Sequence, residues 1–304
     1  MTKKSVTTEK ILKAGNNIRK RILGIALKSG GCYLTQACSS ADLVATLYLK
    51  ILNLGPSLGN RDAILFPGVP SKNNMDYQRG AAYNGYDYKN PDFTKDRFFV
   101  SCCHYSSVIY CALVEAGRID ASAIDKFNGD GWNMEMIGAE HSPGFENTAG
   151  SLGQTISIAA GTAHAYKLKG HTGKIICMLS DGEIAEGQDW ECIQAASFYK
   201  LDNFSVFVDV NKQQIEGWTK NVMNTEPLEE RFKAFGWACV KVNGHDVEAI
   251  INASKTKHKG KPLAILCETD VARGIPLLKT MVPKHFVRIP ENQREVFLKF
   301  YENM

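Results

Sequence analysis

The chain has 304 residues, 44% hydrophobic and 22% charged, which is an ordinary composition for a globular protein with a sizeable buried core. The net charge of +4 is too small to indicate a nucleic-acid partner, and no stretch approaches the roughly 18 apolar residues of a membrane span. The nine cysteines form no C-x-x-C pair, which excludes the usual zinc and redox dithiol motifs, so we expect reduced, buried thiols in a soluble cytoplasmic protein.

Two helices and a long loop are expected in the first third of the chain. Apolar residues recur at helical spacing from Glu9 to Lys28, which predicts an amphipathic helix. Ser39 or Ser40 can cap a second helix that runs through Leu52, because a serine hydroxyl accepts bonds from first-turn amides. Residues 53–96 are rich in Gly, Asn, Pro and Tyr and predict a loop whose length is typical of functional or partner-contacting segments.

The rest of the chain alternates short apolar runs with helical stretches. The runs are RFFVS, KIICMLS, FSVFVDV, ACVKV and LAILCE, and the helical patterns cover Trp190 to Tyr199, Val247 to Ser254 and Glu291 to Tyr301. Strands that are apolar on both faces and return through helices predict a parallel sheet flanked by helices on both faces. No internal repeat is visible, so we predict one α/β domain over residues 1–304, with an N-terminal helical arm and a C-terminal helix.

Polar residues follow two of these predicted strands. Asp181, Gly182 and Glu183 come after KIICMLS, and Asn211 follows FSVFVDV, about 30 residues beyond Asp181. Ligands of an open parallel sheet bind beyond the carboxyl ends of its strands, and one strand-helix-strand unit brings these two ends together. Carboxylate and amide oxygens suit Mg2+ or Ca2+, which can bridge to a diphosphate, and Gly182 lets the backbone approach a phosphate closely.

The segment SDGEIAEGQDWECIQAASFYKLDNFSVFVDVNKQQIEG resembles the thiamine diphosphate signature of transketolases, which is G-D-G followed at a distance by Asn. Ser180 stands where the first Gly is usual. The similarity extends to FFVSCCHYSSVIYCAL, SPGFENTAGSLGQTISIAAGTA and VNGHDVEAI. This resemblance implies the thiamine diphosphate-binding fold, with thiamine diphosphate and Mg2+ (or Ca2+) as cofactors.

The resemblance also implies roles for matching residues. The metal ligands are expected to be Asp181, Asn211 and the backbone carbonyl of Gln213. The residues expected to bind the cofactor are Ser101, His104, Gly150, Ser151, Leu152, Asp181, Gly182, Glu183, Asn211 and His285. The turn Gly150-Ser151-Leu152 is expected to open a helix whose first amides favour phosphate oxygens. The residues expected to act in catalysis are His104, His285 and Glu186, with Glu186 meeting a glutamate of a partner half at the interface.

Two candidate substrate residues depart from the family pattern or match it loosely. When SGGCYLTQACSSAD is aligned with the similar segment of transketolases, Tyr33 stands where a histidine that contacts the ketose is usual. A phenol with a pKa of about 10 cannot shuttle protons at neutral pH as an imidazole does, which leaves the donor specificity open. His141 lies near another family histidine if a gap is allowed, and His245 is expected to shape the turn NGHD.

The resemblance is to the N-terminal half of a split transketolase. Full-length members carry a second domain whose glutamate activates the cofactor, and nothing after Phe286 supplies such a domain. We therefore expect the partner to be a C-terminal transketolase subunit, which binds the pyrimidine half of the cofactor, in an α2β2 heterotetramer that is active only when assembled. The implied reaction transfers a two-carbon ketol unit from a ketose to an aldose, with sugars or sugar phosphates as substrates.

Other hypotheses remain open. The α subunit of a 2-oxoacid dehydrogenase and a fragment of deoxyxylulose-phosphate synthase share the metal motif but match the S-C-C-H, G-S-L-G-Q and N-G-H-D segments less well. A non-catalytic or regulatory subunit that keeps the fold is motivated by Tyr33. A generic nucleotide-binding module needs G-x-G-x-x-G after its first strand, and no such loop follows RFFVS.

Overall fold

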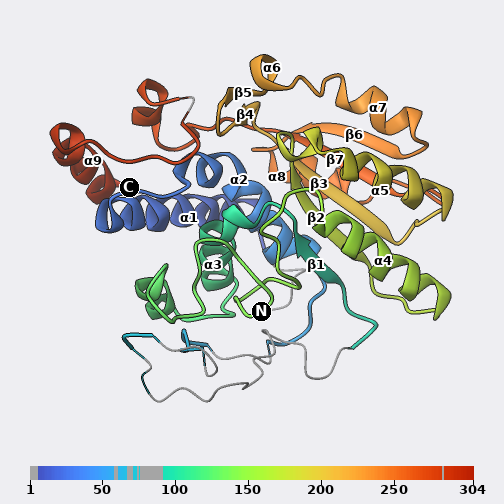
Figure 1. Cartoon of the computed structure of the whole chain (residues 1–304), viewed down its shortest axis with the longest axis horizontal. Helices are drawn as coiled ribbons and strands as arrows, with labels where there is room; N and C mark the ends of the chain where they lie inside the picture. The colour runs from blue at the N-terminus through green and yellow to red at the C-terminus, as the bar shows by residue number, and fades with distance from the viewer. Residues whose placement is uncertain (1–5, 58–60, 67–70, 74, 76–91, 283) are drawn as a thin grey trace.

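The computed structural model describes residues 6–57, 61–66, 71–73, 75, 92–282 and 284–304 (Figure 1). At its centre is a five-stranded sheet in the order β1-β2-β3-β7-β6, in which every neighbouring pair is parallel. The strands are β1 (Arg97–Val100), β2 (Ile175–Ser180), β3 (Phe204–Val210), β6 (Ala238–Asn243) and β7 (Leu263–Glu268). Each predicted apolar run forms one of these strands, so the parallel α/β prediction is confirmed.

Different helices cover the two faces of the sheet (Figure 1). One face packs against α1 (Thr8–Ser29), α2 (Leu34–Thr46), α3 (Ser106–Glu115) and α8 (Val247–Ala253), and the other against α4 (Thr155–Leu168), α5 (Gly187–Phe198) and α7 (Leu228–Ala234). In β2, Ile176 and Met178 join the first core, whereas Ile175, Cys177 and Leu179 join the second, because successive strand side chains point to opposite faces.

The remaining elements are short, apart from the C-terminal helix. They are η2 (Leu47–Ile51), η3 (Cys103–Tyr105), η4 (Ala121–Lys126), η5 (Glu183–Ala185), β4 (Gln213–Gln214), β5 (Gly217–Trp218), α6 (Thr219–Val222), η6 (Pro276–Thr280) and α9 (Glu291–Asn303). The predicted C-terminal helix is α9, which packs against α1. Among the described residues, no helix combines the length and the hydropathy that crossing a bilayer requires. All nine cysteines are free, and only Cys239 is partly exposed, as expected from their pattern.

Helix α1 confirms the first predicted helix, whereas the predicted cap of the second helix is wrong. The second helix begins at Leu34 and continues through a π-helical turn to Ile51, so Ser39 and Ser40 lie inside it. The Ser40 hydroxyl donates to the Gln36 carbonyl at 2.6 Å. A serine hydroxyl within a helix can satisfy itself on the preceding turn, and burial against the sheet favours this arrangement over a cap.

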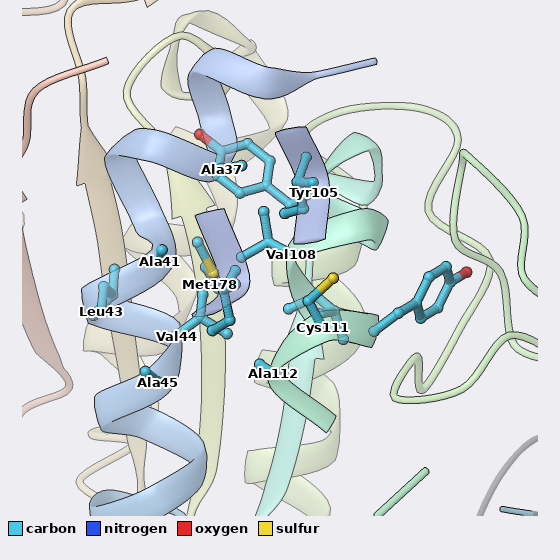
Figure 2. Close-up of a cluster of buried hydrophobic side chains, with 14 of the residues drawn as sticks. Ala37, Ala41, Leu43, Val44, Ala45, Tyr105, Val108, Cys111, Ala112 and Met178 are labelled. Carbon is cyan, nitrogen blue, oxygen red and sulfur yellow. The ribbon is translucent and has the colours of Figure 1, made fainter. Parts of the chain in front are cut away.

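Figure 2 shows how α2 packs against α3 on the first face of the sheet. Ala37 and Ala41 from α2 and Val108 and Ala112 from α3 are buried near Met178 of β2. Small side chains let the two helices approach each other closely at native packing density. The start of α2 lies near the carboxyl end of β1, because Tyr33, directly before α2, packs on His104, shortly after β1, with ring centroids 5.2 Å apart.

A buried charge network joins α1, α2 and the turn after β6. The Arg19 guanidinium donates to both carboxylate oxygens of Asp42, at 2.9 and 2.6 Å, and both residues are 1% exposed. His245 bridges this pair to the chain after β7, because its Nδ1 lies 2.9 Å from Asp42 and its Nε2 accepts from the Asp270 amide. The ring of His245 thus contacts residues outside its own turn, and its predicted role in shaping that turn stays a prediction.

The described part of the predicted 53–96 loop contains isolated bridges and turns and no regular helix or strand after Leu52 and before β1. The Asp96 carboxylate anchors its ends by accepting from the amides of Asn53 and Lys174, at 2.8 and 3.0 Å. Residues 76–91 of this loop, which include its tyrosines, lie outside the described residues.

Candidate active site

The carboxyl ends of β1, β2 and β3 meet at one edge of the sheet. Val100 is in register with Met178, and Ser180 with Asp209. A cleft of about 370 Å³ opens beside these ends. The predicted site residues that line it are Tyr33, His104, Gly150, Leu152, Gly182, Glu183, Glu186, Gln213 and His285. Most of the predicted residues are therefore brought together, although they come from six separate segments of the chain.

Asp181 is buried directly after β2 with half of its carboxylate unsatisfied. Its Oδ2 accepts from the Lys212 amide at 2.7 Å, whereas Oδ1 has no hydrogen-bond partner among the described residues. Burial, together with the charge on Asp209, raises the pKa of Asp181 to about 7. A cation beside Oδ1 would supply the missing partner and favour the ionised form.

Asn211, directly after β3, is held by hydrogen bonds on both sides of its amide. Its Nδ2 donates to Asp209 Oδ2 and to the Tyr105 hydroxyl, both at 3.0 Å, and its Oδ1 accepts from the Gln213 amide at 2.9 Å. The amide oxygen therefore faces the turn at residues 211–213, where a second lone pair is available to a metal.

Asp209 is a site residue that the sequence analysis missed. Its buried carboxylate accepts from Ser39 and Tyr105 at 2.7 Å, from Asn211 at 3.0 Å and from Thr269 at 2.5 Å. It orients Asn211 rather than facing the cleft. A carboxylate inside the apolar run FSVFVDV was the signal that could have found it, because such a group is buried only when it has partners.

The turn after Asn211 is unusually constrained. Lys212 has a φ of +63°, a conformation that residues with a side chain rarely adopt, and its amide is bonded to Asp181. Gln213 then pairs with Trp218 in the β4–β5 hairpin. Gln213 is 2% exposed, and neither polar atom of its side chain has a partner among the described residues. Its predicted contact with the metal through the backbone carbonyl stays a prediction.

Glu183 links β1 to the turn before α4. Its Oε1 accepts from the Ser101 hydroxyl and from the Gly153 amide, the latter at 3.0 Å, and its burial raises its pKa to about 7. Ser101 therefore lies behind Glu183 and outside the residues that line the cleft.

The turn that was expected to open a helix at positions 150–152 is longer than predicted. Helix α4 begins only at Thr155, after Gly153 has turned the chain with a φ of +78°. Gly150 and Leu152 line the cleft, whereas Ser151 is exposed and does not.

The two predicted catalytic histidines are in direct contact. Nε2 of His104 lies 3.1 Å from Nε2 of His285. Burial and the neighbouring His285 lower the pKa of His104 to about 3, and burial lowers that of His285 to about 4, so both rings are neutral at neutral pH. Tyr33 packs on both, with ring centroids 5.2 and 5.8 Å away, and its pKa is raised by burial and by Cys103.

Two further predicted residues lie at or beyond the margin of the cleft. Glu186 lines the cleft and is exposed, at the start of α5. His141 is not brought to the cleft; its Nε2 lies 2.7 Å from the Glu135 carboxylate and its ring packs edge-on against Phe66.

The cleft fits a polar ligand that carries a metal ion. Among the described residues, no group of three or more His, Cys, Asp or Glu side chains is placed to hold a metal alone, so an ion here needs amide, backbone and ligand oxygens as well. Asp181 Oδ1 and Glu183 Oε2 are buried without partners in the described part of the chain. A Cβ atom on Gly182 would lie 2.8 Å from Cγ of Gln214, so glycine keeps this wall open. Asp181 and Asn211 also line a second cavity of about 460 Å³.

Comparison with known proteins identifies the family of this fold and site. Residues 77–293 match the family model described as transketolase, thiamine diphosphate binding domain. The chain is 33% identical to the transketolase family protein y4mO of Sinorhizobium fredii, over 90% of this chain and 88% of that protein. It is 28% identical to the 6-deoxy-6-sulfo-D-fructose transketolase subunit SqwG of a Clostridium species, over 91% of this chain and 90% of that protein.

Solved structures of transketolases share the fold. The structure of transketolase from Campylobacter jejuni superposes with a TM-score of 0.70 at 22% identity and covers 98% of this chain. The chain spans only 47% of that protein, and its fold is the thiamine diphosphate-binding fold. The comparisons therefore agree with the parallel α/β sheet predicted from the strand pattern and with the thiamine diphosphate-binding fold that the resemblance implied.

Proposed function

The chain belongs to the transketolase family, and we propose that it is the diphosphate-binding subunit of a two-subunit transketolase. With a partner subunit, it transfers a two-carbon ketol unit from a ketose to an aldose, both sugars or sugar phosphates. The observation that carries the proposal is the cleft itself. It gathers His104, His285 and Gly182 beside Asp181, whose buried Oδ1 has no partner among the described residues.

The residues of this chain bind and orient, whereas the chemistry comes largely from the cofactor. Thiamine diphosphate, when bound, supplies the group that carries the two-carbon unit. Asp181, Asn211 and the Gln213 carbonyl would hold Mg2+ or Ca2+ against its diphosphate, and Gly182 would let that diphosphate approach the backbone. The imidazoles of His104 and His285 are neutral and contact each other through their Nε2 atoms, so only a ring nitrogen outside these internal contacts can serve an oxygen atom of a ligand.

We assign the rest of the active site to a C-terminal subunit. This chain covers about nine-tenths of the relative named as a subunit but less than half of the transketolase chain from Campylobacter jejuni. Glu186 is exposed at the edge of the cleft, where a glutamate of the partner would meet it. We propose an α2β2 heterotetramer that is active only when assembled, built from this single-domain chain and its partner. The free cysteines support a reducing, cytoplasmic location.

The experiment is calorimetric titration of the assembled complex with thiamine diphosphate in the presence of Mg2+. Asp181→Ala removes the carboxylate with the unpartnered oxygen and is expected to weaken cofactor binding at least tenfold. Asp125→Ala is the matched control, because Asp125 is 70% exposed and forms a surface pair with Lys28. Unchanged cofactor affinity in Asp181→Ala would rule out the metal assignment.

A second candidate function is a non-catalytic role, motivated by Tyr33. Tyr33 and Phe286 meet edge to face, with ring centroids 5.2 Å apart, beside the two histidines. If this aromatic wall replaced the ketose contact without preserving activity, the complex would bind the cofactor and transfer no ketol unit. A screen of ketose donors with the assembled complex separates the two functions.

A further inference from the structure

A buried hydrogen-bond chain connects helix α2 to the two histidines of the cleft. Gln36, in the first turn of α2, is 0% exposed, and its Nε2 contacts Nδ1 of His285, 249 positions away in the sequence. Nε2 of His285 in turn lies 3.1 Å from Nε2 of His104. On the far side, the Thr35 hydroxyl donates to Gln36 Oε1 at 3.0 Å. Gln36 therefore joins the helix to the site without lining the cleft.

We propose that Gln36 is a positioning residue that fixes which ring nitrogen of His285 carries the proton. An amide nitrogen only donates, so Nδ1 of His285 has to accept, and the neutral ring carries its proton on Nε2. That proton points at Nε2 of His104, which accepts it as a hydrogen bond and leaves the proton of His104 on Nδ1. The donors then run in one direction, from Thr35 through Gln36 and His285 to His104.

The direction matters because neither ring is charged at neutral pH. Burial lowers the pKa of both His104 and His285 well below neutrality. A neutral imidazole has one donor and one acceptor, and which nitrogen donates is set by the bond that the other nitrogen makes. Without Gln36, the two tautomers of His285 would compete, and the cleft would present a mixture of hydrogen-bonding patterns to oxygen atoms of a ligand.

Thr35 supports this direction and also ties down the segment that carries His285. Its hydroxyl oxygen lies 3.1 Å from the Lys284 carbonyl and 3.2 Å from the His285 carbonyl, as well as near Gln36. One hydroxyl proton serves only one of these acceptors at a time. If the Gln36 amide were reversed, its oxygen would accept from Nδ1 of His285 and the tautomers of both histidines would be inverted. Measuring the tautomers therefore decides between the two orientations of the amide.

The first test measures the tautomers directly in the isolated subunit, by long-range 15N–1H correlation of the histidine side chains at neutral pH. The expected result is a proton on Nε2 of His285 and on Nδ1 of His104. Gln36→Glu places an acceptor at Nδ1 of His285 and is expected to move the His285 proton there, whereas Gln36→Met leaves a mixture. Thr46→Val is the control and keeps the wild-type tautomers. Thr46 is buried on the same helix, and its hydroxyl donates to the Asp42 backbone carbonyl.

The second test concerns ketol transfer by the assembled complex and rests on the proposed function. Gln36→Glu is expected to lower kcat at least tenfold and to move the acid limb of the pH profile upward, because a carboxylate beside His285 favours its protonated form. Thr46→Val should change neither. A structural defect alone would not shift the pH profile.

The outcomes separate the inference from the proposed function. A wild-type His285 that carries its proton on Nδ1, or one whose tautomer does not respond to either Gln36 variant, would overturn the inference. A complex that binds no thiamine diphosphate but shows the expected tautomers would overturn the proposed function and leave the inference standing. If Gln36→Glu does not fold, the wild-type tautomers and Gln36→Met still decide.

Discussion

Asp189 should make the folded state of this chain less stable as pH rises. It lies in the first turn of α5, is 0% exposed, and neither carboxylate oxygen has a hydrogen-bond partner among the described residues. Burial, with the nearby charges of Glu183 and Glu186, raises its pKa from 3.8 to about 9. Because the folded pKa is above the unfolded one, the stability contributed by protonated Asp189 is full below about pH 4 and is lost as pH rises toward 9.

The size of the effect follows from these two pKa values. Between pH 5 and pH 8, folded Asp189 stays protonated while the unfolded chain carries it ionised, so folding takes up one proton. Each pH unit then lowers the free energy of unfolding by about 1.4 kcal/mol, and the three units lower it by on the order of 4 kcal/mol. Asp189→Asn cannot ionise. The free energy of unfolding of the variant, relative to wild type, should therefore rise by about 4 kcal/mol across this range.

Urea unfolding at pH 5 and pH 8, followed by tryptophan fluorescence, measures this difference. Any constant cost of placing an amide at position 189 appears at both pH values and cancels. Asp125→Asn, at an exposed carboxylate, is the control and should follow the wild-type profile. Parallel profiles for Asp189→Asn and wild type would show that the buried carboxyl finds a partner in solution, and the argument would be wrong.

Three further substitutions test the site and the core. Gly182→Ala brings a Cβ to 2.8 Å from Cγ of Gln214. Calorimetry should show cofactor affinity reduced about tenfold, which corresponds to the loss of about one hydrogen bond, with little change in Tm. Glu186→Gln should leave cofactor binding by the complex intact and lower its ketol transfer rate; an unaltered rate would argue against an interface role. Arg19→Met removes both guanidinium hydrogen bonds of the buried Asp42 and leaves it with the His245 imidazole at 2.9 Å. Urea unfolding should show a loss of about 3–5 kcal/mol, whereas a loss below about 1 kcal/mol would contradict this account.

The sheet and most of the cleft could be predicted because their signals are local. Every residue of β2 is buried, so an uninterrupted apolar run marks it, and the ligand-binding edge follows from where such runs stop. Asp181 and Asn211 lie next to those ends in the sequence. The resemblance to transketolases then supplied residues such as His285, which no strand end indicates.

The features that the sequence did not predict involve residues whose role depends on contacts far away in the chain. The Ser39 hydroxyl can cap a helix or bond elsewhere, and what decides is Asp209, which is 170 positions away and 2.7 Å distant. The contact between Gln36 and His285 joins the two ends of the chain, and no periodicity or spacing carries it. His141 lies against Glu135 and is not among the residues that line the cleft, so its predicted contact with the substrate stays a prediction.

The charge of the cleft makes a final prediction about its metal. The described residues that line it include Glu183, Glu186 and Glu216 and no lysine or arginine. A diphosphate entering such a cleft meets neutral imidazoles and backbone amides, which cannot offset its charge as a cation does. Thiamine diphosphate should therefore bind the complex at least 100-fold more weakly in EDTA than in Mg2+, by calorimetry. Asp181→Ala should lose most of this difference, because its affinity in Mg2+ falls toward the EDTA value. An affinity in EDTA within about threefold of that in Mg2+ would mean that groups of the protein alone neutralise the diphosphate, and the Asp181 metal site would have to be abandoned.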